Sequence, residues 1–181
     1  MPSRLSFKPV TPARWADFEA LFSAPGGPKY CWCMTWRATG DELKAPGPKR
    51  KPFMHQRVKS GTTVGLVGYL EGEPVAWVSI APRDTYRGEL GGPEAQPAER
   101  IRSLACMYVK RQLRKDGLSQ ELIEAAAAYA KKRGATVLEA YPVSPDSPSY
   151  RFMGFVPAFQ RLGFKAAGTA GSRRHVMRLA L

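Results

Sequence analysis

Hydrophobic residues recur at several different periods along the chain, and these periods predict where its helices and strands lie. In the stretch "TPARWADFEALFS" the apolar residues recur at helical spacing after Thr11 and Pro12, residue types that begin helices, so we expect a helix over residues 12–23. The stretch "KPFMHQRVKSG" predicts a second, shorter helix that Gly61 ends. Between the two lies a segment rich in Gly and Pro that nevertheless contains several aromatic residues.

After the second helix the pattern changes to strands that alternate with helices. Two β-rich runs, residues 64–70 and 74–80, flank the turn sequence "EGE" and predict an antiparallel hairpin. We expect a strand over residues 101–109, an alanine-rich helix that ends near Gly134, and a buried strand over residues 136–143. The stretches "FVPAFQRLGF" and "SRRHVMRLAL" predict a short helix and a last strand.

The order of these elements indicates the fold class. A strand, a helix and a strand in succession over residues 101–143 form a right-handed parallel crossover, whereas the hairpin before them is antiparallel. We therefore expect an α/β (α+β) fold, a mixed central sheet with helices on both faces. A chain of 181 residues with 44% hydrophobic residues is typical of one globular domain with a sizeable core.

The charge balance narrows the class of partner. The chain has 28 Lys and Arg against 15 Asp and Glu, a formal net charge of +13, which favours an anionic partner such as nucleic acid, an acidic surface or a phosphorylated ligand. The basic residues are spread along the chain and form no run interleaved with aromatic residues, which argues against nucleic acid. A solvated basic surface explains them equally well.

Cysteine content and hydropathy indicate the compartment. Three cysteines are an odd and small number, which does not indicate a disulfide framework. The first residues lack the apolar core of a signal peptide, and no stretch approaches the roughly 20 apolar residues of a membrane span. We therefore expect a cytoplasmic protein without a membrane partner.

The loop "RKDGLS" leads from the strand over residues 101–109 directly into the alanine-rich helix. The N-terminus of a helix offers unpaired amide donors and a partial positive charge, and a glycine lets a ligand approach the backbone closely. With Arg111, Arg114 and Lys115 around it, this loop has the properties of a phosphate-binding cradle. A basic turn without a ligand is the alternative that the loop alone leaves open.

The spacing of this loop resembles the acyl-coenzyme A signature of the GNAT superfamily of N-acetyltransferases. In that signature a strand-ending Val, here Val109, is followed by Arg/Gln-x-x-Gly-x-Gly/Ala at the start of a helix, here "RKDGLS" with Ser119 in the last place. The stretches "GYLEGEPVAWVSIAP", "ATVLEAYPV", "FQRLGFKAAG" and "HVMRLAL" resemble further elements of the family, so the resemblance covers residues 64–181. The segment "CWCMTWR", together with Cys106, resembles a subgroup of uncharacterised bacterial members.

The resemblance implies a splayed sheet that binds acetyl-coenzyme A as a cosubstrate between two parallel strands that part. The strand end pairs with the pantetheine arm, and the loop amides bind the pyrophosphate. The cofactor-binding residues that it implies are Met107, Tyr108, Val109, Arg114, Lys115, Asp116, Gly117, Leu118 and Ser119. Residues 1–63 then supply the acceptor site and residues 64–181 the coenzyme A-binding core of a single domain.

The implied activity is direct transfer of an acetyl group to a primary amine of a small molecule or peptide, by a monomer or homodimer. Many members of the family donate a proton from a Tyr on the last helix and place a Glu in the central strand, and these places resemble Phe159 and Ser103 here. The candidate catalytic residues are therefore Cys106, Tyr108 and Tyr150. A cysteine within a strand is more often part of the core, and proximity with an oxyanion hole also accelerates transfer without a dedicated acid.

In this family the segment between the first two helices lines the acceptor site. Trp32 and Trp36 would then form an aromatic wall, and Arg37 would hold a carboxylate of the acceptor. Arg83, just after a strand, is a second candidate substrate-binding residue. Packing of the two tryptophans into the core is the alternative.

The sequence does not favour a metal site. The Cys-x-Cys pair of "CWCMTWR" and the only two histidines, His55 and His175, do not easily complete a set of four ligands, so we expect no metal. Structural roles are favoured for both histidines.

Two other classes of function stay open. Phe159, which cannot donate a proton, is consistent with a coenzyme A-binding module that has lost catalysis, and the charge of +13 is consistent with a basic nucleic-acid-binding protein. Turnover with a panel of amines separates the first class from an enzyme, and a steep fall of affinity with salt indicates the second.

Overall fold

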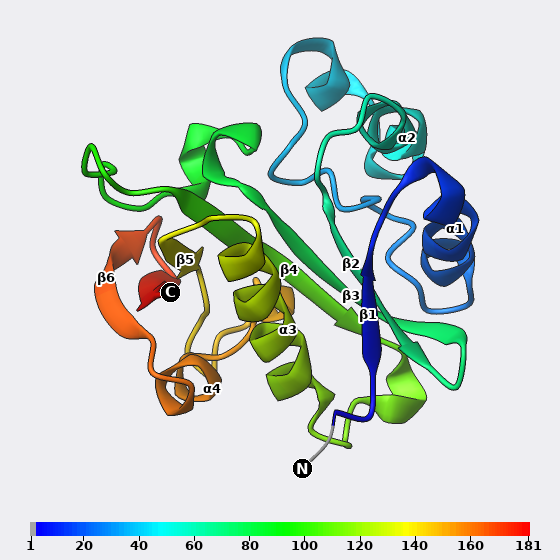
Figure 1. The fold of residues 1–181 in the computed structure, drawn as a ribbon. Coiled ribbons are helices and arrows are strands. Elements are labelled where there is room, and N and C mark those ends of the chain that lie inside the picture. Colours follow the sequence, from blue (N-terminus) through cyan, green and yellow to red (C-terminus); the bar gives the residue numbers. More distant parts are fainter. Residues whose placement is uncertain (1–2) are drawn as a thin grey trace.

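A seven-stranded sheet forms the centre of the protein in the computed structural model, which describes residues 3–181 (Figure 1). The strand order is β1-β2-β3-β4-β5-β7-β6. The strands are β1 (Ser6–Pro9), β2 (Gly65–Leu70), β3 (Glu73–Pro82), β4 (Ile101–Val109), β5 (Val137–Ala140), β6 (Lys165–Ala170) and β7 (Arg174–Ala180). Only β4 and β5 are parallel neighbours, and every other adjacent pair is antiparallel. The predicted mixed sheet is confirmed.

Helices cover both faces of the sheet, as the element order predicts. On one face lie α1 (Trp15–Ser23) and α2 (Lys51–Lys59), and on the other lie α3 (Leu118–Lys132) and α4 (Val156–Arg161) (Figure 1). Each pair of helices buries apolar side chains against its own face of the sheet, so the protein has a separate core on each side.

Strand β3 is buried on both faces, because alternate side chains of a strand enter the two different cores. Val78 and Ile80 belong to the core under α3. Trp77 is fully buried in the other core, where its ring centroid lies 4.9 Å from that of Phe18 and 5.7 Å from that of Phe22. Packing on both sides fixes β3, and β3 in turn supports the neighbouring β4.

The strands β4 and β5 separate after four residues. The four residues of β5 pair with the first four residues of β4. β5 ends at Ala140, so the predicted strand to residue 143 is too long, because Pro142 has no N–H with which to continue the ladder. Residues 105–109 of β4 continue without a neighbouring strand on that side, and a bulge against β3 at Ala105 coincides with the point of separation. This separation is the expected splay.

Two strands and one helix start differ from the pattern-based expectation. The pattern does not predict β1 or β6, because "SFKP" is short and "KAAGTA" contains residues of low strand propensity. Both are edge strands, which pairing with a neighbour holds in place. The first helix opens as a 3-10 turn over Pro12–Arg14 and becomes α-helical at Trp15, and the Thr11 side chain makes no capping bond. Within residues 3–181 no helix combines the length and apolar character needed to cross a membrane.

Candidate functional site

A cleft of about 640 Å³ opens where β4 and β5 part. Most of its lining comes from four parts of the chain: the end of β4, the start of α3, the segment of residues 30–37 and the segment of residues 148–155. The splay therefore brings together a strand end, a helix N-terminus and two irregular segments that lie far apart in the sequence.

The free edge of β4 forms the floor of the cleft. All five residues from 105 to 109 line it. Since β5 does not extend beside them, backbone groups on that edge can pair with an extended ligand, as an added strand would, except the Val109 carbonyl oxygen, which accepts from Arg114 Nε.

The N-terminus of α3 forms one end of the cleft. Gly117 occupies the N-cap position with a φ of 74°, a left-handed conformation that glycine adopts without strain, and no side chain caps the helix. Leu118 and Ser119 line the cleft, so the first amides of a 15-residue helix lie at its border. Arg114 also lines it and donates from Nε to the carbonyl oxygen of Val109 at 2.9 Å. This end of the cleft has the geometry of an anion site.

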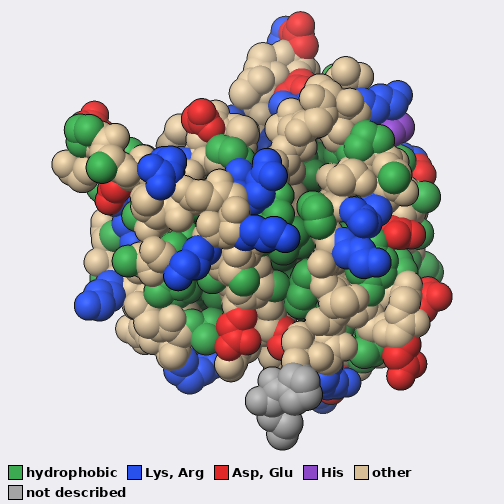
Figure 2. Space-filling model, in the orientation of Figure 1, with side chains coloured by type: hydrophobic (Ala, Val, Ile, Leu, Met, Phe, Trp, Pro, Cys, Tyr) green, Lys and Arg blue, Asp and Glu red, His purple; other side chains and the backbone are tan. Residues whose placement is uncertain are grey.

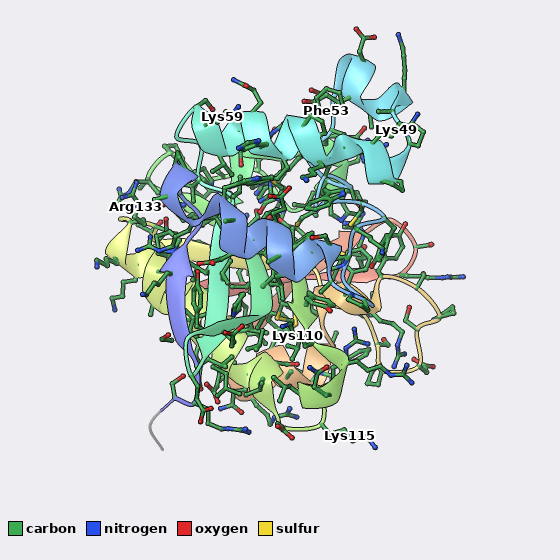
Figure 3. All side chains as sticks on the ribbon, turned by 90° about the vertical axis from the view of Figure 1, so that its right-hand side faces the viewer. Lys49, Phe53, Lys59, Lys110, Lys115 and Arg133 are labelled. Atoms are coloured by element: carbon green, nitrogen blue, oxygen red, sulfur yellow. The ribbon has the colours of Figure 1, made fainter. Side chains whose placement is uncertain are left out.

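Three residues of the predicted phosphate loop, Lys115, Asp116 and Gly117, do not line the cleft. The Asp116 carboxylate turns to Arg4, with 3.4 Å between Oδ2 and Nη2. Lys115 is exposed and extends away from the protein (Figure 3). The loop therefore offers its backbone and Arg114 to the cleft, while the negative charge of Asp116 is paired on the surface.

The predicted acceptor-site residues divide into two groups. Trp36 and Arg37 line the cleft. Trp32 does not line it and packs in the core with its ring centroid 5.7 Å from that of Phe22. Arg83 also lies outside it, because it donates to the carbonyl oxygen of Pro93 at 2.7 Å and pairs with the buried Glu139 at 3.4 Å. Trp32 and Arg83 thus lie outside the cleft.

The three candidate catalytic residues all line the cleft. The Tyr108 hydroxyl donates to the carbonyl oxygen of Gly26 at 3.3 Å. Tyr150 is 37% exposed and has a left-handed backbone with a φ of 58°, and its ring centroid lies 6.2 Å from that of Trp36. Cys106 lies at the start of the splay, beside the bulge of β4.

Phe159 and Ser103, the positions that resemble those of a catalytic Tyr and Glu in the family, are buried inside the protein. Phe159 is fully buried against Phe164, and the same part of the chain presents Phe155 and Ala158 to the cleft. The Ser103 hydroxyl is fully buried and lies 2.7 Å from the hydroxyl of Tyr141. Neither position reaches the cleft.

Both histidines also lie outside the cleft. His55 stacks on Trp15 with a centroid distance of 4.2 Å, and His175 Nε2 lies 3.3 Å from the hydroxyl of Ser144. In residues 3–181 no group of three or more His, Cys, Asp or Glu side chains is arranged to hold a metal ion.

A buried polar cluster at the inner end of the cleft is the feature that sequence reasoning missed. Arg37, 2% exposed, donates from Nη1 to the carbonyl oxygen and the sulfur of Cys33 and from Nη2 to the hydroxyl of Tyr86. Trp77 Nε1 donates to the same sulfur at 3.3 Å. Ser79 completes the cluster, with its hydroxyl 2.7 Å from that of Tyr86. The repeated Cys and the Arg of "CWCMTWR" are the only sequence signal for it.

This cluster gives the three cysteine thiols different pKa values. Hydrogen bonding from Cys106, the charge of Arg37 and the Trp77 indole hold the pKa of Cys33 well below the ordinary thiol value, despite burial. The pKa of Cys106 is raised by that same bond and by burial. Burial raises the pKa of Cys31 to about 11. The cleft therefore brings together one thiol with a lowered pKa and two thiols with raised pKa values.

Comparison with protein families gives one match. Residues 15–164 match the family model described as "Acetyltransferase (GNAT) family", and this range spans the chain from α1 to α4, including every part that lines the cleft. None of the curated protein sequences matches the chain.

Solved structures share the fold over nearly the whole chain. The GNAT domain of S. lividans PAT is 20% identical, with 98% of this chain and 90% of that chain covered and a TM-score of 0.58. PaiA N-acetyltransferase from Thermoplasma acidophilum, solved in complex with coenzyme A, is 12% identical with 99% and 100% covered and a TM-score of 0.56. Drosophila melanogaster polyamine N-acetyltransferase, described as catalysing the formation of N-acetylagmatine, is 16% identical with 98% and 100% covered and a TM-score of 0.57. At these identities the likeness concerns the fold.

Proposed function

The chain belongs to the acetyltransferase (GNAT) family, and from this premise we propose that it transfers the acetyl group of acetyl-coenzyme A directly to a primary amine of a small molecule or peptide. The observation that carries the proposal is the cleft of about 640 Å³ at the splay, which the uncapped N-terminus of α3 borders. Acetyl-coenzyme A is an extended thioester with phosphates at one end, and it matches a free strand edge that leads to a helix N-terminus.

We assign the two ends of the cosubstrate to the two ends of the cleft. The pyrophosphate accepts hydrogen bonds from the first amides of α3, and Arg114 adds positive charge there. The pantetheine arm pairs with the edge of β4 at Met107 and Val109. The thioester then lies beside Cys106, where the strands part.

The wall opposite β4 supports an amine as the acceptor. Tyr30 and Tyr150 expose aromatic rings at the cleft, with 63% and 37% of each residue accessible. Aromatic faces attract cationic amines, and agmatine and polyamines, named for the Drosophila melanogaster structure, belong to this chemical class. Among the described lining residues Arg37 already donates to four acceptors, so it is better placed to hold the wall than to bind a carboxylate.

We assign the proton donor for the leaving coenzyme A thiolate to Tyr150. Its hydroxyl makes no hydrogen bond within residues 3–181, whereas the Tyr108 hydroxyl is bonded to Gly26, and the interaction with Cys33 raises the pKa of the Cys106 thiol. A left-handed backbone at a residue other than glycine is strained, and such strain clusters at functional sites. Tyr108 and Cys106 are the alternatives, and the next experiment separates Tyr108 from Tyr150.

Steady-state kinetics with a panel of amines test the proposal. We expect release of free coenzyme A that depends on added agmatine, spermidine or a short peptide amine. Replacing Tyr150 with Phe should lower kcat about 100-fold or more without weakening acetyl-coenzyme A binding, whereas Tyr108→Phe serves as the matched control and should leave kcat near the parent value. Tight binding of acetyl-coenzyme A without turnover of any amine would contradict the proposal and favour a coenzyme A-binding module.

A further inference from the structure

The cleft contains no conventional base for the amine. Among the described residues that line it, none is Asp, Glu or His. The charged side chains on its lining are Arg37, Arg114 and Arg151, and all three are cationic. Direct acetyl transfer nevertheless requires a group that accepts the proton of the attacking amine.

The buried cation of Arg37 favours a negative charge among the groups that it contacts. Its guanidinium is 2% exposed and remains protonated at any ordinary pH. Within residues 3–181 it forms no ion pair with Asp or Glu, and it donates instead to two carbonyl oxygens, the Tyr86 hydroxyl and the Cys33 sulfur. A buried charge without a counter-charge is unfavourable, and Cys33 is the contact that ionises most readily, because burial raises the pKa of Tyr86 to about 12.

The surroundings of the Cys33 sulfur suit an anion. Arg37 Nη1 and Trp77 Nε1 each lie 3.3 Å from it, and both groups are donors only. Trp77 is fully buried, so its N–H has no access to water and depends on this sulfur. A neutral thiol accepts hydrogen bonds weakly, whereas a thiolate accepts them strongly.

The backbone that positions the Cys33 sulfur is strained. Trp32 and Cys33 both have left-handed conformations, with φ values of 51° and 56°. Two successive residues of this kind without a glycine are strained, and strain persists where the surrounding structure over-determines it. Here the strained turn places Trp32 in the core and Cys33 on the cleft.

We propose that Cys33 is a thiolate that serves as the general base of the acetyl transfer, in the place where a carboxylate would otherwise be needed. The inference rests on the proposed function. As the amine nitrogen forms its bond to the acetyl carbon, its proton passes to the Cys33 sulfur, and the carbon–sulfur bond to coenzyme A breaks. Coenzyme A leaves as a thiolate and takes a proton from Tyr150, which regains one from the Cys33 thiol through the cleft. Amide and free coenzyme A are the products, and Cys33 returns to a thiolate.

The other titratable groups around Cys33 stay in one form near neutral pH. Burial is the main cause of the raised pKa values of Cys31, Tyr30 and Tyr86. The pKa of Cys106 on β4 is also raised, and its interaction with Cys33 is the larger cause there. Arg37 remains a cation. Titration of the cluster in the acid range therefore belongs to Cys33, whose thiolate is lost as the pH falls through its lowered pKa.

The charge of Cys33 is measured without any substrate. The ultraviolet absorbance of thiolate is titrated in the parent protein, in Cys33→Ser and in the matched control Cys31→Ser. We expect one thiolate at neutral pH in the parent and in Cys31→Ser, its loss only at acid pH, and its absence in Cys33→Ser. Equal absorbance of all three proteins at neutral pH overturns the inference, whether or not an acceptor amine has been found.

Kinetics then test the role of the thiolate. We expect Cys33→Ser to lower kcat by at least 100-fold with an unchanged affinity for acetyl-coenzyme A. Cys33→Asp should restore part of the lost kcat, and the dependence of kcat on pH should then show the acid limb of a carboxylate. Cys31→Ser should behave as the parent. Full activity of Cys33→Ser overturns the general-base role. If acetyl-coenzyme A binds but no amine reacts with the parent protein, the proposed function fails, and the absorbance titration still decides whether Cys33 is ionised.

Discussion

Two buried arginines show how differently a guanidinium is accommodated in this fold. Arg174, 6% exposed, donates to the carbonyl oxygens of Leu90 and Glu89. Arg102, 9% exposed, has an Nη1 atom without any hydrogen-bond partner in residues 3–181, and its guanidinium lies 5.7 Å from the ring centroid of Tyr129. An unsatisfied buried charge destabilises the folded state, whereas a satisfied one supports it.

Replacing Arg102 with Met should therefore raise the free energy of unfolding by about 1 kcal/mol, because the unpaired charge is removed and the apolar stem is kept. Urea unfolding measures the change, with an unaltered dependence on urea as the sign of an unaltered fold. The matched control is Arg174→Met, which should lower the free energy of unfolding because two carbonyl oxygens lose their donors. A loss of stability in Arg102→Met would contradict this account of the side chain.

At the scale of elements, the junction between β4 and α3 makes the strongest link between sequence and site. Gly117 provides the left-handed N-cap, and Ser119 lies exposed on the first turn at the border of the cleft. A negative charge at this position favours the helix itself but opposes a bound phosphate. Stability and coenzyme A affinity should thus respond in opposite directions.

We expect Ser119→Asp to weaken acetyl-coenzyme A binding about tenfold or more, while the melting temperature without ligand stays the same or rises. Ser119→Ala is the matched control, and it should bind as the parent because the family resemblance expects a small residue here. Isothermal titration calorimetry measures both affinities. Unchanged affinity in Ser119→Asp would mean that the pyrophosphate does not lie at the N-terminus of α3.

Most elements were predictable because each has a local signal. The hairpin around the "EGE" turn, the strand over residues 101–109 and the alanine-rich helix that ends near Gly134 are all confirmed. β1 and β6 are not predictable in this way, because pairing with β2 and β7 stabilises short or Ala- and Gly-containing edges. The end of β5 depends on where Pro142 and the splay interrupt the ladder, which the apolar run "ATVLEAYPV" does not reveal.

Only the part of the candidate site that is formed by one continuous stretch of sequence was predictable. The loop of residues 114–119 is one stretch, and its contact with the cleft follows from its place before a helix. The Cys33 cluster joins Cys33 and Arg37 of one segment to Trp77 and Tyr86 of two others, so the segment "CWCMTWR" alone does not reveal it. Sequence also does not reveal that Arg83 lies outside the cleft, since its partner Glu139 lies 56 residues away.

At the scale of the whole molecule, the charge of +13 is spread widely. Lys and Arg side chains occur over much of the face in Figure 2, with Asp and Glu side chains among and around them. Such a surface attracts any polyanion over a distance that salt shortens to about 10 Å at 0.1 M. The cleft differs from the surface because it also offers free amides and a strand edge, so its selectivity for acetyl-coenzyme A should persist at high salt.

Thermal melting with and without acetyl-coenzyme A, at low and high salt, tests the central claim most directly. Ligand at about 100 times its dissociation constant adds about 2.7 kcal/mol to the stability of the folded state, which for a domain of this size is a rise of roughly 5–10 °C. The account predicts such a rise at both salt concentrations and none with a nucleic acid of equal charge at high salt. No rise with millimolar acetyl-coenzyme A would contradict it, and a rise with nucleic acid alone would identify the basic surface as the binding site.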